Sequence, residues 1–509
     1  MKKKTVIVLS IALLTMVFIG IYPYKETEKK ETKIPSDWFF RQRAYPYERI
    51  NHEVYVRSLQ TAQYMKESGI ETPWEFAGPI NIEGRLSDIE VTKAIIPTIY
   101  IGAATGGVFK SSNLGADWQA IFDINASLSI GDIAISPSDE NIIYVGTGEA
   151  NAGGGSLTYD GTGIYKSVDA GENWVNVGLE NSGAIGRMVV DPNNSDIVYV
   201  AAMGRLFADG SEGGVFKTID GGQSWEQKLF VSDSTGAIDI VINPENPQII
   251  YVAMWERVRR PGRRSYGGPT SGIYKSTDGG ENWNELLVGL PTNGSEKGRI
   301  GIDISASNPN VLFAAYADSI GYFQGVYKTL NGGLSWIKTD AGIGSDAFSS
   351  FGWWFGRIKV DPLNQNTAYL IGLYIHKTIN GGSSWSSLSA WQMHIDQHAV
   401  AINPTNSSQV FAGNDGGFYS STNGGQSWNR NANLPITQFY TCELDEQHPE
   451  RLYGGTQDNG TNRTMTGDFD DWESIYGGDG FRVIVDPIDN DFIYAEYQYG
   501  GLARSTNGG

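Results

Sequence analysis

Short apolar stretches alternate with turn-forming stretches along most of the chain, in a pattern that predicts β-strands rather than helices. Segments such as GVFKS, GIYKS and GVYKT are short strands of apolar and β-branched residues. Upstream of them lie paired β-branched runs, as in MVVDPNNSDIVYVAA from Met188 and IVINPENPQIIYVAM from Ile240. An Asp-Pro or Asn-Pro turn between two such runs is typical of a β-hairpin.

An eight-residue box follows each of these short strands. Seven full copies begin, 43 to 58 residues apart, at Ser111, Ser167, Thr218, Ser276, Thr329, Thr378 and Ser421. In each box the Asp or Asn can fold its side chain onto backbone N–H groups, while glycine supplies a positive φ. The closing tryptophan can then pack between neighbouring repeats. We therefore interpret the boxes as structural turns and not as catalytic carboxylates.

Each repeat contains four predicted strands, and a repeat of roughly 40–50 residues is the size of one propeller blade. We therefore predict an all-β protein, a β-propeller of four-stranded blades with about eight or more blade units, over residues 73–509. A degenerate box ends at Trp472, and the final residues STNGG match the start of another box. We expect from this that the array is incomplete, or C-terminally truncated.

The N-terminal segment has a different pattern. Three lysines precede an apolar run from Val6 to Tyr22, so residues 1–24 are expected to be a signal peptide or an N-terminal membrane anchor. Residues 25–72 are expected to be a linker with one helix, because ERINHEVYVRSLQTAQYMKESG has a helical period and ends at Gly69. The protein is then extracytoplasmic, either secreted or anchored with a short cytoplasmic N-terminus, and this segment would be its only link to a membrane.

Composition narrows the classes of partner. The net charge of -19 disfavours nucleic acid, since an acidic chain repels phosphate backbones. The single cysteine, Cys442, excludes an internal disulfide and a thiolate metal cluster. High glycine and tryptophan content, with only 19% charged residues, agrees with an all-β fold rich in tight turns.

The two faces of such a propeller differ in their loops. The Asp-Pro turns and the boxes fall on one face, so the opposite face carries the long loops, where a binding surface is expected. Candidate ligand-binding residues there are Glu149, Trp353, Trp354, Arg257, Arg259, Arg260, Arg263 and Arg264. The arginines can bind a carboxylate or sulfate, or they can neutralise acidic loops of neighbouring blades. The two tryptophans can stack on a sugar ring.

Two groups of titratable residues stand out. His394, Asp396 and His398 alternate along a predicted strand, so they can hold a divalent metal, act as acid and base, or form a hydrogen-bonded cluster between blades. Aligning the blades places Asp132, Arg187 and Asp239 at the start of successive inner strands. We expect those residues to form ion pairs between blades around the central channel.

The boxes and the phrases GTGEAN, MWERVRRP, HIDQHAVAINP, GNDGGFYSS and GTQDNGT give the chain a family likeness from Trp74 to its end. It resembles BNR/Asp-box repeat propellers of the sortilin N-terminal-domain and xyloglucanase-like group. Xyloglucanases of this fold place one catalytic carboxylate in each of two propellers. Ala104 of GAATGG stands where the resemblance requires the first aspartate, and Asp415 of GNDGG occupies a similar setting in a later blade.

Two functions follow from this likeness. The first is a binding or scaffold propeller that recognises a glycan or an extracellular peptide through its long-loop face. The alternative is a glycoside hydrolase acting on polysaccharide, for which Asp415 is the candidate catalytic residue. A pair of facing carboxylates about 5–10 Å apart would favour the hydrolase.

Overall fold

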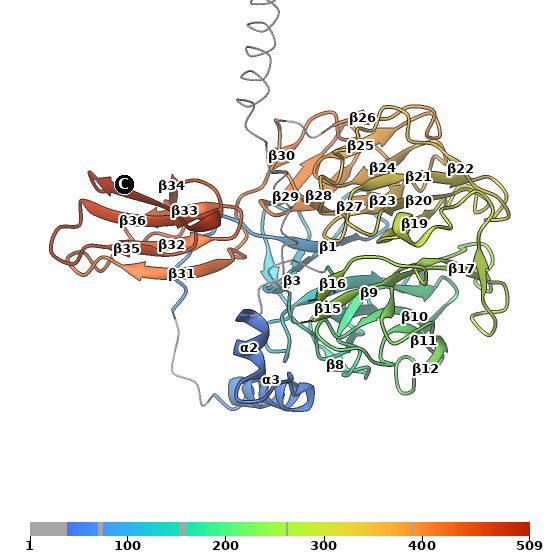
Figure 1. The fold of residues 1–509 in the computed structure, drawn as a ribbon, viewed down its shortest axis with the longest axis horizontal. Coiled ribbons are helices and arrows are strands. Elements are labelled where there is room, and N and C mark those ends of the chain that lie inside the picture. The colour runs from blue at the N-terminus through green and yellow to red at the C-terminus, as the bar shows by residue number, and fades with distance from the viewer. Residues whose placement is uncertain (1–37, 70–74, 152–157, 261–262, 389–390) are drawn as a thin grey trace, which may run out of the picture.

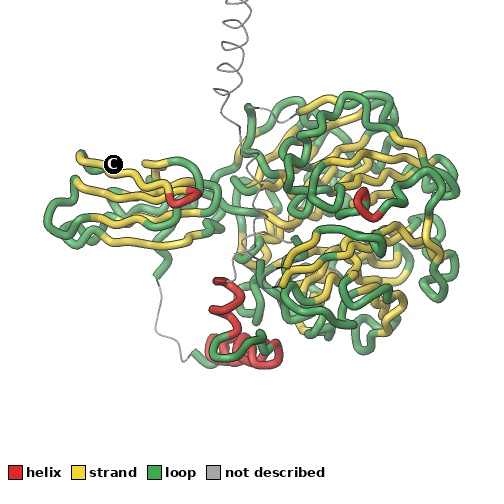
Figure 2. The backbone as a smooth tube through the Cα atoms, in the orientation of Figure 1, coloured by secondary structure: helices red, strands yellow, loops and turns green. Residues whose placement is uncertain are grey.

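The computed structural model describes residues 38–69, 75–151, 158–260, 263–388 and 391–509. The expected signal or anchor segment, residues 1–24, lies outside the described residues. Among the residues that are described, no helix is both long enough and apolar enough to span a membrane. Figure 2 shows strands throughout, with the longer helices confined to the segment before the first sheet.

Seven four-stranded antiparallel sheets follow one another along the chain, and each is a contiguous meander. Their strands are β1 (Leu86–Val91), β2 (Ile99–Ala103), β3 (Gly107–Ser111), β4 (Gln119–Ala120); β5 (Ile130–Ile135), β6 (Ile143–Thr147), β7 (Ile164–Ser167), β8 (Val175–Asn176); β9 (Ala184–Asp191), β10 (Asn194–Gly204), β11 (Gly214–Thr218), β12 (Glu226–Leu229); β13 (Thr235–Ile242), β14 (Ile250–Glu256), β17 (Gly272–Ser276), β18 (Asn284–Leu286); β19 (Ile300–Ile304), β20 (Leu312–Ala317), β21 (Phe323–Thr329), β22 (Ile337–Lys338); β23 (Arg357–Val360), β24 (Ala368–Ile371), β25 (Ile375–Thr378), β26 (Ser386–Ser387); and β27 (Gln397–Ile402), β28 (Val410–Asn414), β29 (Gly417–Ser421), β30 (Asn429–Arg430). A small two-stranded ribbon, β15 (Val258–Arg260) with β16 (Arg263–Ser265), projects from the fourth sheet.

These seven sheets close into a ring. The inner strand of each sheet packs beside that of the next, and β27 of the seventh sheet packs against β1 of the first. Leu86 of the first sheet and Phe411 and Phe418 of the seventh belong to one buried apolar cluster. Glu83, just before β1, accepts the backbone N–H of Phe418 at 2.9 Å and that of Asn433 at 3.1 Å. The predicted all-β propeller of four-stranded blades is confirmed.

Two further sheets lie outside the ring, on the left of Figure 1. The eighth sheet contains β31 (Phe439–Leu444), β32 (Leu452–Thr456), β33 (Gly460–Thr464) and β34 (Glu473–Tyr476), and the ninth contains β35 (Val483–Val485), β36 (Phe492–Tyr497) and β37 (Gly501–Thr506). We call these two sheets the outer pair. They share a small apolar core that includes Tyr453 and Val483. The sequence pattern had placed all the repeats in one array, and the packing divides them into a ring and the outer pair.

The boxes are turns between the third and fourth strands of the ring sheets, as their spacing predicts. In one of them Ser167 Oγ accepts the N–H of Gly171 at 2.9 Å, and Asp169 accepts the N–H of Asn173 at 2.9 Å. Hydrogen bonds from Asn173 lower the pKa of Asp169 to about 2. The indole N–H of Trp174 donates to the backbone oxygen of Ile121 in the preceding sheet, at 2.8 Å. The polar groups of this box therefore form hydrogen bonds with the protein backbone, as expected for a structural turn.

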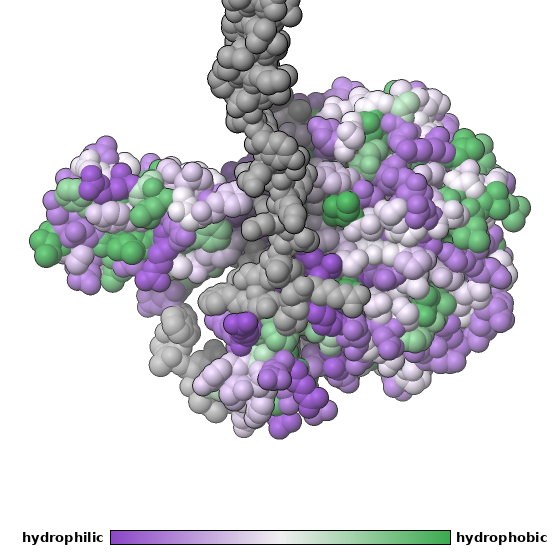
Figure 3. Space-filling view, viewed as in Figure 1, coloured by the Kyte–Doolittle hydropathy of each residue, from purple (hydrophilic) through white to green (hydrophobic). Residues whose placement is uncertain are grey.

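In the described residues before the first sheet there are two helices, where a single one was expected. They are α2 (Trp38–Ala44) and α3 (His52–Glu67), and the predicted end near Gly69 agrees with the end of α3. Asn51 caps α3, because its side chain accepts the N–H of Val54. Both helices lie below the outer pair in Figure 1, beside the ring. The surface in Figure 3 is predominantly hydrophilic with scattered apolar residues, in keeping with the negative net charge.

Candidate functional site

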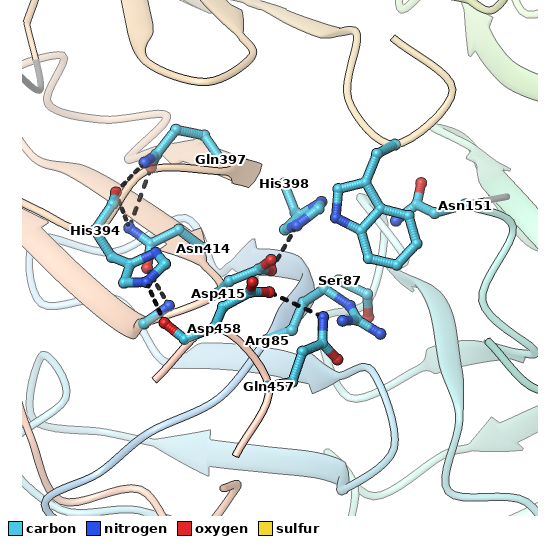
Figure 4. Close-up of polar contacts among 12 residues, drawn as sticks. Arg85, Ser87, Asn151, His394, Gln397, His398, Asn414, Asp415, Gln457 and Asp458 are labelled. Atoms are coloured by element: carbon cyan, nitrogen blue, oxygen red, sulfur yellow. Dashed lines mark hydrogen bonds and ion pairs between the residues drawn. The ribbon is translucent and has the colours of Figure 1, made fainter. Parts of the chain in front are cut away.

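A cluster of carboxylates lies where the seventh sheet of the ring meets the eighth sheet. Asp415 is in the turn between β28 and β29, Asp396 immediately precedes β27, and Asp458 is in the turn between β32 and β33. Carboxylate oxygens of all three residues lie within 4.8 Å of one another. Figure 4 shows the carboxylates of Asp415 and Asp458 pointing toward each other. Asp415 is 2% exposed.

Hydrogen bonds across the junction fix these turns. Asn459 of the eighth sheet donates to the backbone oxygen of Asp415 at 2.8 Å. The Nε2 of His394 lies 3.1 Å from the backbone oxygen of Asp458, and its Nδ1 lies 2.7 Å from that of Ile395. The His394 ring therefore links the loop before β27 to the turn that carries Asp458.

The environment separates the pKa values of the cluster. Burial, with the nearby carboxylates of Asp415 and Asp458, raises the pKa of Asp396 to about 8. Burial, with the neighbouring Asp415, raises the pKa of Asp458 to about 6. Burial also raises the pKa of Asp479, in the loop before β35, to about 6. Near neutral pH the cluster therefore holds a protonated Asp396 beside an ionised Asp458, an arrangement typical of an acid and base pair.

His398 holds Asp415 in place by a hydrogen bond, while the positive charge of Arg85 acts on the Asp415 carboxylate. Burial lowers the pKa of His398 to about 3, so its ring is neutral and its Nε2 donates to Asp415 at 2.7 Å. Arg85 makes two hydrogen bonds to the Glu149 carboxylate, at 3.1 and 2.9 Å, and both side chains are buried. Its guanidinium lies 4.5 Å from the ring centroid of Trp354. Sequence reasoning named Glu149 and Trp354 but missed Arg85, which links them.

The three residues predicted to bind a metal, His394, Asp396 and His398, do not form one binding site in this structure. His398 bonds to Asp415, whereas His394 bonds to backbone oxygens, so the two imidazoles do not converge with Asp396 on one point. Asp396 also precedes β27 and has a φ of 69°, so these residues do not alternate along one strand as expected. Among the described residues, the group that can hold a divalent cation is Asp396, Asp415 and Asp458.

The predicted arginine loop contains the ribbon of β15 and β16, in which Arg259 is opposite Arg264 and Arg260 is opposite Arg263. Arg257 is buried and donates to the backbone oxygens of Ala150 and Gly204. Arg259 is buried with its guanidinium 5.1 Å from the Phe207 ring centroid. Arg260 pairs with Asp209 in the loop between β10 and β11, which fits the expected neutralisation of an acidic loop of a neighbouring blade. Arg264 is exposed with its guanidinium 5.9 Å from the Tyr266 ring centroid, and the side chain of Arg263 is outside what the structure describes.

The two candidate tryptophans face protein side chains. Trp353 stacks on Tyr266 with ring centroids 5.2 Å apart, and Trp354 carries Arg85 on its face. Because Arg85 covers the Trp354 ring, that ring is not free to stack on a sugar as predicted.

The expected ion pairs between blades are present in the channel: Arg187 pairs with Asp239 at 2.8 Å. Asp132 instead accepts the backbone N–H of Met188 in the next sheet, at 2.7 Å.

Ala104 lies in the turn between β2 and β3, which is equivalent in the meander to the turns of Asp415 and Asp458. It is fully buried, and its N–H donates to the backbone oxygen of Arg85 at 3.0 Å. The neighbouring Thr105 accepts a hydrogen bond from Gln438 at 3.2 Å. The first-sheet turn therefore borders the junction but contributes no carboxylate to it.

A cavity of about 590 Å³ opens beside the carboxylates, between α3, the ring and β31. Its lining includes Thr105, Tyr159, Tyr440 and Gln457. Gln457 donates to the Asp458 carboxylate at 3.0 Å, so the cavity ends next to the cluster.

Comparison with known proteins finds relatives of low sequence identity. No protein-family model matches the chain. The chain is similar to xyloglucanases. Over 342 residues it is 22% identical to xyloglucanase Xgh74A of Acetivibrio thermocellus, covering 58% of this chain and 37% of that protein. Over 334 residues it is 24% identical to a xyloglucanase of Hypocrea jecorina, covering 57% of this chain and 37% of that protein.

A solved structure extends the likeness at the level of the fold. The GH74 enzyme of Niastella koreensis superposes with a TM-score of 0.60 at 17% identity, covering 85% of this chain and 66% of that one. The matches thus span well under half the length of the curated relatives. They support a xyloglucanase-like propeller, while the narrower Asp-box and sortilin-like resemblance stays a prediction.

Proposed function

We propose that this protein hydrolyses glycosidic bonds of a polysaccharide, at the junction between the ring and the outer pair. The observation that carries the proposal is the approach of Asp396, Asp415 and Asp458 to within 4.8 Å, with the pKa of Asp396 raised to about 8 and that of Asp458 to about 6. The sequence alone gave Asp415 no partner carboxylate. The xyloglucanase relatives favour hydrolysis over the binding scaffold that was our first expectation.

The three carboxyl groups take different roles in this proposal. Asp396 donates its proton to the glycosidic oxygen as the bond from that oxygen to the anomeric carbon breaks. Asp458, ionised and half-buried, forms a bond to the anomeric carbon. A water molecule then attacks the same carbon, returns a proton to Asp396 and releases Asp458. Asp415 is a positioning residue, held by His398 and lying against both of the others.

The test is hydrolysis of xyloglucan and of unsubstituted β-glucan by the full chain, followed as release of reducing ends. Asp458→Asn and Asp396→Asn should each lower the rate about 10²–10⁴-fold. Asp470→Asn is the matched control, because Asp470 is an exposed aspartate of the same sheet and lies outside the cluster. Equal rates for all three variants would disprove the assignment.

One observation favours a second candidate, recognition of a glycan without cleavage. Ala104 leaves the first-sheet turn without the carboxylate that the xyloglucanase resemblance requires. Tight binding of xyloglucan by the full chain, with no release of reducing ends, would select this function. In either case the polymeric ligand supports our proposal of an extracytoplasmic location.

A further inference from the structure

Helix α3 covers the ring without packing tightly against it. Of its sixteen residues only His52 is buried. A lone helix of this length is marginally stable in water, so it depends on its anchors. His52 Nε2 lies 3.3 Å from the backbone oxygen of Glu180, Tyr55 donates to that of Asp160 at 2.9 Å, and Lys66 donates to that of Asp123 at 3.1 Å. The helix is thus held at both ends across the second-sheet loops.

Between these anchors one face of α3 borders a hollow. Tyr55, Leu59, Ala62 and Lys66 follow one another at the spacing of a single helical face, and all four line the 590 Å³ cavity that ends at Gln457. Ala62 is exposed and Leu59 is only half-buried. The face that would normally pack into a core is therefore turned toward open space.

The hollow continues along the helix away from the carboxylates. A second cavity of about 290 Å³ shares Tyr55 and Tyr159 with the first. Its other aromatic lining residues are Tyr45, Tyr47 and Phe207. A third cavity of about 560 Å³ shares Asp160 and Phe207 with the second. We call these three cavities, which share lining residues beside α3, the groove; the first of them reaches Gln457 next to the Asp458 turn.

The lining of this groove has the chemistry of a sugar-binding surface. Tyr47 is 68% exposed and Tyr45 84%, so their rings are accessible to a ligand. Tyr159 is 43% exposed and has the Arg43 guanidinium over one face, 4.5 Å from the ring centroid, so part of its ring is accessible. Tyrosine rings offer flat apolar faces with a polar tip, which suits the apolar faces and hydroxyl edges of pyranose rings. Gln438 and Gln457 add amide groups near the carboxylate end.

We propose that α3 is the wall of an extended subsite for a glycan chain, which leads residues of a long substrate from Tyr159 to the Asp458 turn. This inference rests on the proposed function, because it takes the carboxylate cluster as the point where the same chain is cleaved. The subsite adds affinity for long chains and leaves the cleavage of short ones unaffected.

The test measures binding of xyloglucan oligosaccharides of increasing length to the full chain carrying Asp458→Asn, by isothermal titration calorimetry. Affinity should rise with length. Tyr159→Ala should weaken binding of the longest oligosaccharide about tenfold. Ala62→Trp, which fills the groove from an exposed position, should abolish the length dependence.

Two control variants are on the same helix but outside the groove. Tyr64 is 64% exposed and Thr61 is exposed, and neither lines the three cavities. Tyr64→Ala and Thr61→Trp should bind all lengths as the parent does, with unchanged thermal unfolding in all four variants.

The outcomes separate the two proposals. Length-independent binding, or unchanged binding of long chains by both Tyr159→Ala and Ala62→Trp, overturns the subsite while hydrolysis at the carboxylates stands. Failure of every oligosaccharide to bind, together with no hydrolysis by the unsubstituted protein, overturns both.

Discussion

Asp415 and Asp458 face each other across the boundary between the ring and the outer pair, with carboxylate oxygens within 4.8 Å. Each is in the turn between the second and third strands of its sheet, so equivalent turns of two consecutive sheets supply the two groups. Two like charges at this distance are unfavourable unless one group keeps a proton. The carboxylate cluster at the junction therefore keeps a bound proton near neutral pH, and this protonation has measurable effects on activity and stability.

The pH dependence of hydrolysis should be bell-shaped, with limits near pH 6 and pH 8. Below about pH 6 Asp458 gains a proton and cannot act on the anomeric carbon. Above about pH 8 Asp396 loses the proton that it donates. The measurement is kcat/KM for xyloglucan from about pH 4 to about pH 10, a range that includes the titrations of both Asp458 and Asp396. A rate that stays constant from about pH 5 to pH 9 contradicts these roles.

Asp396→Asn should stabilise the folded protein at high pH. The pKa of Asp396 is raised from 3.8 to about 8 in the folded chain, so its contribution to stability is complete below about pH 4 and is lost as the pH rises through 8. Asparagine stays neutral, so the Tm of the variant should exceed that of the wild type above pH 8 and equal it near pH 4. Calorimetry at both pH values tests this, with Asp470→Asn as the control. If the variant were less stable than the wild type at high pH, the buried charge of ionised Asp396 would not be destabilising.

Arg85→Met should destabilise the ring by about 3–5 kcal/mol, because it leaves the Glu149 carboxylate buried without its partner. The double variant Arg85→Met, Glu149→Leu should recover part of this loss. Lys338→Met is the control, since its ion pair with Asp340 is exposed and contributes about 0–1 kcal/mol. Urea unfolding followed by tryptophan fluorescence gives the three values. A single variant no less stable than the control would show that the buried pair contributes little.

Chelation should leave hydrolysis unchanged. Asp396, Asp415 and Asp458 can also coordinate a divalent cation, but the proposed chemistry uses a proton on Asp396 in its place. Initial rates before and after EDTA treatment distinguish a proton on Asp396 from a bound cation. Activity that disappears with EDTA and returns with Ca²⁺ would assign the three carboxylates to a cation.

The first product should retain the anomeric configuration of the substrate. Carboxyl oxygens within 4.8 Å are nearer to the separation of about 5–5.5 Å found in retaining glycosidases than to the about 6.5–9.5 Å of inverting ones. Proton NMR during the first minutes of hydrolysis identifies the anomer. An inverted product would require a base other than Asp458.

The blades were predictable because their signals are local. Within one box, Ser167, Asp169 and Gly171 bond to one another over a few residues, so the turn is encoded in a contiguous segment. The division into a ring and an outer pair was not predictable, because the seventh and eighth repeats have the same kind of pattern. Which sheets close the ring depends on packing between Leu86 and Phe418, far apart in sequence.

The site was only partly predictable for a related reason. Asp415 was named, but its proximity to Asp458 arises from the docking of one sheet against another. The phrases GNDGG and GTQDNGT, which occupy equivalent turns, were the available signal. The bonds from Arg257 to backbone carbonyl oxygens could not be predicted, because such partners cannot be identified from the sequence. The ion pair of Arg260 with Asp209 agrees with the alternative that these arginines neutralise acidic loops of neighbouring blades.

The closure of the ring between β1 and β27 has a mechanical consequence. Each sheet is a contiguous meander, so among the described strands none from the first sheet pairs within the seventh sheet, or the reverse. The seam is held by side-chain packing and by Glu83, whose hydrogen bonds to Phe418 and Asn433 cross it. Tension applied between the two ends of the ring would therefore separate the first sheet from the seventh before it breaks the hydrogen bonds within any sheet.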